Sequence, residues 1–570
     1  MNRFRFRFVV CFPLAIALGA GCSSSQAVSG DAAGMASGGT PGLGSGGTSG
    51  SDGTSIETGP PVTPGDPGSA DVHIEIRSDS DVHPISPLIY GTAQPEKGSQ
   101  TPYTLLRSGG NRMTAYNWET NASNAGSDYM FQNDNNLSKS STPGDALQGT
   151  LTGAKALGGT ALLTIPMVDY VAGDENGGGD VRNSGSDYLQ TRFKQNRATK
   201  GSDLSTTPDA TDAYVNEDEF VNWVKTVGAA NGPSVFFALD NEPDLWSKTH
   251  AEVHPDPVTY DELCTRNATY ATMVKNLWPE AKVTGFVSYG FTGYVSLQNA
   301  PDAAGKGDFI EYYLDQMKAA EATAGHRVVD YLDLHWYPEA TGGGKRITGT
   351  DTAAASVTAR VQAPRSLWDA SYQETSWIVN DVLKEPIHLI PRINDKIAAH
   401  YPGTGLAITE WNYGGGQDIS GAVAVADVLG IFGSYGVAIG SYWALGNETF
   451  ANAAFRAYRN FDGAGAAFGD TSIHASSSDV ETATVYASTD STHPGRLVTV
   501  LINKATSAKT AGITIAHPTS FASLSVYTLT SAGANVVAGS AVPAAAENAF
   551  LYTMPALSVS VLVGSAAAPR

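Results

Sequence analysis

At 570 residues the chain is long enough for a barrel domain with one accessory domain, so we expect two folded units. Charged residues make up 16% of the sequence, and 62 Gly and 29 Pro indicate a loop-rich protein that still has enough apolar residues for a core. The formal net charge of -21 disfavours nucleic acid and anionic membrane surfaces as partners, whereas a neutral polymer would not be repelled.

Residues 1–22 have the features of an export signal. Three arginines precede the apolar run Phe8–Leu18, which is too short to span a bilayer. The segment Leu18–Cys22, followed by three serines, resembles a bacterial lipobox, although Gly19 departs from the usual leucine. We therefore expect an extracytoplasmic protein, secreted or held on the outer surface of a bacterium by a lipid on Cys22, with ordinary cleavage nearby as the alternative.

Residues 23–70 consist mainly of Gly, Ser, Thr and Pro, which cannot bury enough apolar surface to offset chain entropy, so a flexible linker is predicted. Residues 71–84 contain the alternating segment Val72–Ile76, which is typical of a strand with one apolar face. This strand precedes the first barrel-like segment and is a candidate member of another domain.

Residues 85–458 contain eight short apolar runs of the buried-strand type, separated by helical or polar stretches. The runs cover residues 88–90, 104–107, 161–165, 234–239, 282–287, 328–334, 406–409 and 440–443. Helical spacing over residues 217–227, 261–277 and 377–383 fits the crossover helices that parallel strands need. The region therefore predicts a TIM-like (β/α)8 barrel of the α/β class.

Residues 459–570 lack helical patterns, and short alternating segments dominate. Strands are expected at residues 482–487, 496–503, 512–515, 524–529 and 557–563. This pattern predicts an all-β sandwich domain.

Two glutamates stand at the carboxyl ends of predicted barrel strands. Glu242 follows the apolar run 234–239, and Glu410 follows the run 406–409. In a β/α barrel the strand ends and their loops converge on one open face, so we expect the two carboxyl groups to meet. A carboxylic acid and a carboxylate on either side of a sugar linkage are the groups that glycoside hydrolysis requires. The neighbouring Asn241 is placed to reach a sugar 2-hydroxyl.

Four segments carry a resemblance to glycoside hydrolase family 44, which includes endoglucanases and xyloglucanases. They are Leu106–Tyr129, Ala238–Trp246, Leu334–Glu339 and Ile408–Gly415, and the resemblance extends from about residue 76 to residue 563. It implies a barrel fused to a sandwich that also takes in residues before the barrel. It further implies retaining cleavage of β-1,4-glucan backbones, with Glu242 as general acid/base and Glu410 as nucleophile. We expect endo-action and no required cofactor.

Several side chains near these segments are candidates for binding sugar. Pyranose rings stack on aromatic faces, so Trp246, Tyr337 and Trp443 are predicted platforms, although each aromatic residue could equally pack in the core. The wider aromatic set adds Trp118, Trp336 and Trp411. The neighbouring Asn111 and Arg112 follow the second strand, where the guanidinium could orient a carboxylate or form a structural ion pair. His335 could bond the nucleophile or a sugar hydroxyl.

Metal binding has weaker support. Asp174, Glu175 and Asp180, among glycines, could hold a structural calcium ion, but a solvated loop is the simpler interpretation. His250, Glu252, His254 and Asp256 alternate after Glu242, and a polar loop is again favoured.

We therefore expect a monomeric polysaccharide hydrolase with no nucleic acid partner and no membrane contact beyond an N-terminal lipid. A mannanase or xylanase is the alternative within enzymes. The rival from another class is a non-catalytic glycan-binding surface lipoprotein.

Overall fold

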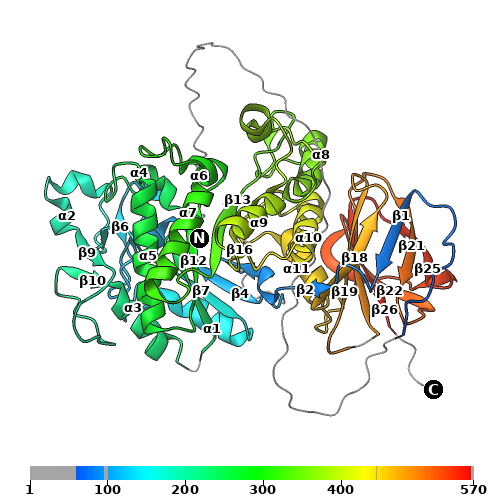
Figure 1. The fold of residues 1–570 in the computed structure, drawn as a ribbon, viewed down its shortest axis with the longest axis horizontal. Helices are drawn as coiled ribbons and strands as arrows, with labels where there is room; N and C mark the ends of the chain where they lie inside the picture. The colour runs from blue at the N-terminus through cyan, green and yellow to red at the C-terminus, as the bar shows by residue number, and fades with distance from the viewer. Residues whose placement is uncertain (1–58, 96–100, 231, 444–445, 494, 566–570) are drawn as a thin grey trace, which may run out of the picture. The chain divides into compact units, whose positions relative to one another are not determined.

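The computed structural model describes residues 59–95, 101–230, 232–443, 446–493 and 495–565, so the predicted export signal and Cys22 lie outside the described residues. Eight parallel strands close into a barrel, and a larger sheet is built mainly from the C-terminal region (Figure 1). The barrel strands in chain order are β3 (Gly91–Thr92), β4 (Leu105–Ser108), β7 (Thr160–Ile165), β11 (Ser234–Leu239), β12 (Lys282–Ser288), β13 (Tyr331–Trp336), β16 (Gly405–Trp411) and β17 (Ile439–Tyr442). The predicted barrel is confirmed.

The first barrel strand begins later than predicted. Residues Pro87–Ile89 form the 3-10 turn η1, because Pro87 favours the start of a helical turn and the Ser86 hydroxyl accepts a hydrogen bond from the Leu88 N–H. The strand β3 follows at Gly91–Thr92. The prediction of a strand at residues 88–90 was therefore wrong by two to three positions.

Helices connect the barrel strands. The longer ones are α1 (Asp145–Ala156), α3 (Glu217–Trp223), α5 (Tyr260–Leu277), α7 (Phe309–Ala324), α8 (Ala354–Gln362), α9 (Leu389–His400), α10 (Ile419–Ser434) and α11 (Thr449–Arg459). The side chains of Thr259 and Asp308 cap α5 and α7 by accepting backbone N–H groups three residues on. Residues Ile378–Leu383, predicted as a helix, form the π-helical turn η8.

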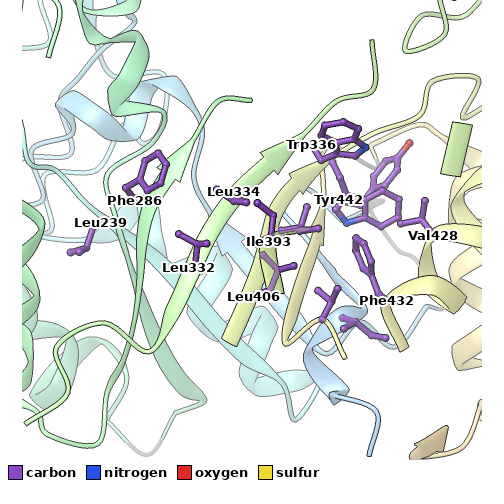
Figure 2. Packing of buried hydrophobic residues seen from close by; sticks show 14 of the residues in the cluster. Leu239, Phe286, Leu332, Leu334, Trp336, Ile393, Leu406, Val428, Phe432 and Tyr442 are labelled. Carbon is purple, nitrogen blue, oxygen red and sulfur yellow. The ribbon is translucent and has the colours of Figure 1, made fainter. Parts of the chain in front are cut away.

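The barrel is filled by apolar side chains. One residue from each of six strands forms a buried cluster, as expected for an interior layer, namely Leu105, Leu162, Ala238, Val287, Ala407 and Ile439. A larger cluster joins strands to outer helices, and Figure 2 shows part of it around Leu406 of β16, Ile393 of α9, Phe432 of α10 and Tyr442 of β17. This packing fixes the strand ends that carry the site.

The second sheet has eleven strands. Its path includes β1 (Val72–Arg77), β2 (His83–Pro84), β18 (Thr471–Ser477), β19 (Ala483–Thr489), β20 (Leu497–Asn503), β21 (Lys509–Ala516), β22 (Ser523–Thr530), β24 (Val542–Ala546), β25 (Ala549–Met554) and β26 (Ser558–Gly564), with β23 (Gly533–Ala538) beside β22. Strand β1 pairs parallel with β21 and antiparallel with β18. The strand before the barrel therefore belongs to the sandwich, as the family resemblance implied.

Part of the predicted linker also lies against this sheet. The Val62 N–H donates to the carbonyl oxygen of His517 at 3.0 Å, and the Gly65 N–H donates to that of Glu547 at 2.7 Å. These residues fall within the predicted linker of residues 23–70, yet their backbone is hydrogen-bonded to the sandwich. The composition of the segment does not reveal these bonds, because backbone groups of any residue except proline can donate them.

Helix α10 lies between the barrel and the sandwich, with nearly all of its residues buried. Its Asp427 accepts hydrogen bonds of 2.6 Å from the hydroxyls of Thr484 and Tyr486 and lies 2.7 Å from the Lys504 ammonium. In the described part of the chain, no helix combines the length and apolar character needed to cross a membrane.

Candidate active site

The backbone around Glu242 adopts an unusual conformation at the end of a barrel strand. This residue follows β11, and both Asp240 (φ 67°) and Glu242 (φ 49°) adopt left-handed conformations that are uncommon for residues with a side chain. Asp240 holds the turn, since its carboxylate accepts from the Thr114 hydroxyl at 2.7 Å and the Met167 N–H at 2.5 Å. The Glu242 N–H donates to the Val287 carbonyl oxygen at 3.0 Å. These bonds fix the direction in which the Glu242 side chain leaves the barrel.

Glu410 lies near the end of β16 and is 5% exposed. Its Oε1 is 2.6 Å from Nη1 of Arg107 on β4, and its Oε2 accepts from the Tyr337 hydroxyl at 2.8 Å. Each oxygen of this carboxylate therefore has a donor, and one donor carries a full positive charge. Charge-assisted bonds of this kind orient a carboxylate and favour its ionised form.

The two glutamates meet as the strand positions predicted. One oxygen of Glu242, one oxygen of Glu410 and one ring nitrogen of His335 lie within 4.8 Å of one another. His335, near the end of β13, has Nδ1 2.8 Å from Oε1 of Glu242 and 3.5 Å from Oε2 of Glu410. Among the described residues, Glu242, His335 and Glu410 form the group whose oxygen and nitrogen atoms are close enough together to ligate a metal ion.

The environment separates the charge states of the two carboxyl groups. Burial, and then the negative charge of Glu410, raises the pKa of Glu242 well above its ordinary value. Burial alone would also raise the pKa of Glu410, but His335 when charged, the Arg107 guanidinium and the bonds from Arg107 and Tyr337 make it lower than usual. Burial lowers the pKa of His335. The pair can thus hold a proton on Glu242 while Glu410 is a carboxylate.

Asn241 lies beside the pair and is held through its amide oxygen. That oxygen accepts from Nη2 of Arg107 at 2.9 Å and from the Gly110 N–H at 3.1 Å. Both bonds use the oxygen, which leaves the NH2 group as the part of the side chain that can donate to a substrate. Arg107 therefore links Asn241 to Glu410.

Arg112 does not orient either glutamate of the site. Its guanidinium pairs with Asp134 at 2.6 and 3.2 Å, and Nη1 also donates to Ser123. Arg112 lies in the 3-10 turn η2 (Asn111–Ala115), beyond the strand end, so its side chain reaches the β5–β6 hairpin (Ser123–Asn124, Asn133–Asp134). The alternative of a structural ion pair is the one that the structure supports. Asn111 donates from its side chain to the carbonyl oxygen of Ala125.

Most of the predicted aromatic platforms are buried. Trp246 is 0% exposed and donates its indole N–H to Asp240. Trp118, Trp336 and Trp411 are also 2% exposed or less and pack against neighbouring side chains. Their assignment as sugar platforms was wrong, because a sugar cannot reach a fully covered ring.

Tyr337 and Trp443 differ from the buried tryptophans, since both are partly exposed. A Cβ added at Gly110, which has φ 92°, would lie 2.5 Å from the Trp443 ring. Because the Gly110 N–H also donates to Asn241, the indole lies next to the strand end that carries Asn241 and Glu242. Trp443 is therefore the tryptophan of the predicted set whose position suits sugar stacking.

The weaker metal candidates are occupied by protein partners. Asp174 is paired with Arg192 at 2.6 and 3.0 Å, and Asp180 is paired with Arg182 at 2.6 Å. These cationic groups occupy the oxygens that a calcium ion would need, so the residues do not fit that ion.

The two histidines of the loop after Glu242 are also bonded to other protein groups. His250 contacts Glu252 and the Asn111 carbonyl oxygen at 2.8 Å, while His254 contacts Glu262 at 3.0 Å. This pattern matches the polar-loop interpretation.

Arg107 is the site residue that sequence reasoning missed. It stands inside the apolar segment Leu105–Ser108 and is 1% exposed. A charged side chain within a run of buried-strand type is costly unless it is paired, and this cost is the signal that could have revealed it.

Comparison with known proteins identifies the family. The model of glycoside hydrolase family 44 matches residues 122–340. Endoglucanase A of Paenibacillus lautus is 38% identical over 513 residues, which cover 87% of this chain and 73% of that protein. Beta-mannanase/endoglucanase A of Caldicellulosiruptor saccharolyticus is 41% identical over 461 residues, which cover 76% of this chain but only 34% of that protein.

A solved structure of a Paenibacillus polymyxa xyloglucanase from the same family, with xyloglucan, is also similar. It has a TM-score of 0.83 and 38% sequence identity, and the match covers 87% of this chain and 100% of that one. The resemblance inferred from the four sequence segments is thereby confirmed. The chain belongs to glycoside hydrolase family 44.

Proposed function

We propose that the protein is an endo-acting hydrolase that cleaves β-1,4-glucan backbones, of the cellulose or xyloglucan type, with retention of anomeric configuration. The observation that carries the proposal is the approach of Glu242 and Glu410 to within 4.8 Å with opposite pKa shifts. This bound joins one oxygen of each residue, and such a close approach suits the carboxyl separation of about 5–5.5 Å typical of retaining enzymes better than the gaps of about 6.5–9.5 Å of inverting ones. The endoglucanase and xyloglucanase names of similar proteins support the substrate class.

In the first step Glu410 attacks the anomeric carbon, and the bond to the leaving sugar oxygen breaks. Arg107 and Tyr337 keep the nucleophile ionised and aimed, because each donates to one of its oxygens. Glu242 transfers its proton to the departing oxygen at the same time. The product of this step is a glycosyl ester on Glu410.

In the second step Glu242, now a carboxylate, takes a proton from water, whose oxygen attacks the anomeric carbon and releases Glu410. Burial and the charge of Glu410 both raise the pKa of Glu242, and conversion of Glu410 to a neutral ester removes the second of these causes, so Glu242 becomes able to act as a base. A neutral His335 that donates from Nδ1 to Oε1 would leave Oε2 of Glu242 for proton transfer. The proposed reaction needs no cofactor.

Substrate contacts are assigned to residues around this pair. The NH2 group of Asn241 would donate to the sugar 2-hydroxyl, an interaction that strengthens as the transition state develops. Trp443 would supply an aromatic face for a pyranose ring. Tyr337 would act mainly through its bond to Glu410 and less as a platform.

Other glycan backbones are candidates beside β-1,4-glucan. The name of the Caldicellulosiruptor relative includes mannanase as well as endoglucanase, which makes mannan the second candidate backbone, with xylan as a further alternative. Activity of purified protein on xyloglucan, unbranched β-glucan, mannan and xylan should favour the first two. Preference for mannan or xylan would overturn the substrate assignment.

Retention is tested on the same protein by following the anomeric proton signals of the first product by NMR. The β-anomer should appear before mutarotation, and an initial α-anomer would exclude double displacement. No reducing-end release on any of the four polymers would favour the rival glycan-binding protein. Added chelator should leave the rate unchanged.

Export and lipid anchoring are also proposed, on the basis of residues 1–22 alone. Labelled palmitate should be incorporated into the full chain produced in a bacterial host. A Cys22→Ala variant should lose the label, and equal labelling of both would refute acylation at this residue.

A further inference from the structure

A cavity lies away from the paired glutamates. It has a volume of about 470 Å³ and is lined by residues of α10, β18 and β19, together with Trp368 after helix α8. Ser434 and Tyr435 contribute from the end of α10, and Asp81 and His83 contribute from the segment between β1 and the barrel. The volume is within the range of about 300–1,000 Å³ typical of small-ligand sites.

This cavity is on the opposite side of the barrel from the catalytic glutamates. Helix α10 connects the parallel strands β16 and β17, so it runs back toward their amino ends. Ser434 and Tyr435 are therefore level with the start of β17, whereas Glu410 lies at the carboxyl end of β16. A ligand segment bound in the cavity therefore does not contact Glu242 or Glu410.

The cavity has an aromatic wall. The rings of Trp368 and Tyr435 have centroids 6.0 Å apart and an interplanar angle of 33°, and both residues are partly exposed. Among the described residues no acceptor bonds the Trp368 indole N–H, although that nitrogen is buried. Because this nitrogen is covered, a ligand would contact Trp368 through the exposed part of its ring and not through the indole N–H.

The polar groups of the lining suit a neutral, hydroxyl-rich ligand. His474 Nδ1 lies 2.7 Å from Asp81 Oδ2, which gives both a donor group and an acceptor group at the rim. Ser476, two residues after His474 and on the same face of β18, adds a hydroxyl that can donate and accept. The described residues that line the cavity include neither lysine nor arginine, which phosphate or carboxylate ligands would require.

We propose that this cavity is a non-catalytic binding site for a neutral glycan chain, with Trp368 and Tyr435 as its stacking platform. The inference rests on the proposed function, because the same polysaccharide would occupy both the catalytic cleft and this site. Two sites on one chain raise the residence of the enzyme on a long polymer through effective concentration. Short oligosaccharides, which cannot span the two faces, would gain nothing from it.

The test uses the full chain with Glu410→Gln, so that polymer is bound but not cut. Retardation in native gels containing xyloglucan or hydroxyethylcellulose measures affinity for a neutral glycan, and polygalacturonate serves as the charged control polymer. Trp368→Ala and Tyr435→Ala should each weaken retardation by neutral polymer about tenfold. Trp278→Ala, which removes another partly exposed tryptophan outside the cavity, should leave it unchanged.

Ser476→Trp provides an independent test by filling the cavity instead of removing its wall. It should reproduce the loss of retardation, with a thermal unfolding midpoint close to that of the parent. Unchanged retardation in Ser476→Trp and Tyr435→Ala would overturn the second site. Failure of the proposed function would instead appear as absent reducing-end release in the chain with Glu410 intact.

Discussion

Arg107 and Glu410 are 303 positions apart in the sequence, yet Nη1 of the first lies 2.6 Å from Oε1 of the second in the barrel interior. The same guanidinium holds the amide oxygen of Asn241, which precedes Glu242. One buried cation thus connects the strand ends that carry both candidate catalytic carboxyl groups. This connection defines the most direct tests of the site.

Arg107→Gln should reduce kcat/KM on polysaccharide by roughly a hundredfold, because it removes the charge that favours ionised Glu410 and releases Asn241. The matched control is Arg112→Gln, which breaks an ion pair with Asp134 that does not involve Glu242 or Glu410. Steady-state kinetics of the two variants provides the comparison. Equal losses would contradict the assignment of Arg107 to the site.

Glu410→Gln should lower kcat on the order of 10⁴-fold or more, since no nucleophile remains. Glu242→Gln should retain more activity on aryl glycosides with acidic leaving groups than on polysaccharide, because such groups depart without protonation. Rates on the two substrate types measure this difference. A Glu75→Gln control on the sandwich should keep full activity, and turnover by Glu410→Gln would exclude that residue as nucleophile.

The pH profile should be bell-shaped, with activity rising as Glu410 ionises and falling as Glu242 loses its proton. Tyr337→Phe removes a hydrogen bond that favours the charged form of Glu410, so the pKa of Glu410 should rise. Activity requires the ionised form, and the acid limb should therefore move to higher pH. Profiles of kcat/KM against pH test this shift, and an unchanged acid limb would argue against the contact.

Trp443→Ala should weaken binding of polysaccharide about tenfold without unfolding the barrel, because the ring is partly exposed beside Gly110. Trp246→Ala should instead destabilise the fold by ~3–5 kcal/mol, since its side chain is fully buried. Binding measured in the Glu410→Gln background and thermal unfolding separate the two effects. The reverse pattern would restore Trp246 as a platform.

Lys504→Met should destabilise the protein by ~3–5 kcal/mol, because it leaves the buried Asp427 carboxylate of α10 without its ammonium partner. Combining it with Asp427→Asn should recover part of the loss, since the unpaired charge is removed. Denaturant unfolding of the single and double variants forms the cycle. Strictly additive losses would show that the two groups are not coupled.

Local sequence patterns were sufficient for many features of the fold. The apolar runs at β7 and β11 and the amphipathic segment at α5 depend on neighbours in the chain, and their predicted positions agree closely with the structure. Strands β18 and β25 were not predicted, and the predicted helix at residues 377–383 became a π-helical turn. Pairing partners far along the chain decide such elements.

Motifs and apolar runs readable in the sequence were enough to predict the family, the barrel and the sandwich, and to place two glutamates at strand ends on one face of the barrel. Which charged group serves that pair depends on the folded chain, because the Arg107 guanidinium reaches Glu410 inside the barrel whereas that of Arg112 pairs with Asp134. The tertiary structure also decided that Trp443 is open while Trp246 is covered. Burial and contact are properties of segments brought together by folding, and a single stretch of sequence does not contain them.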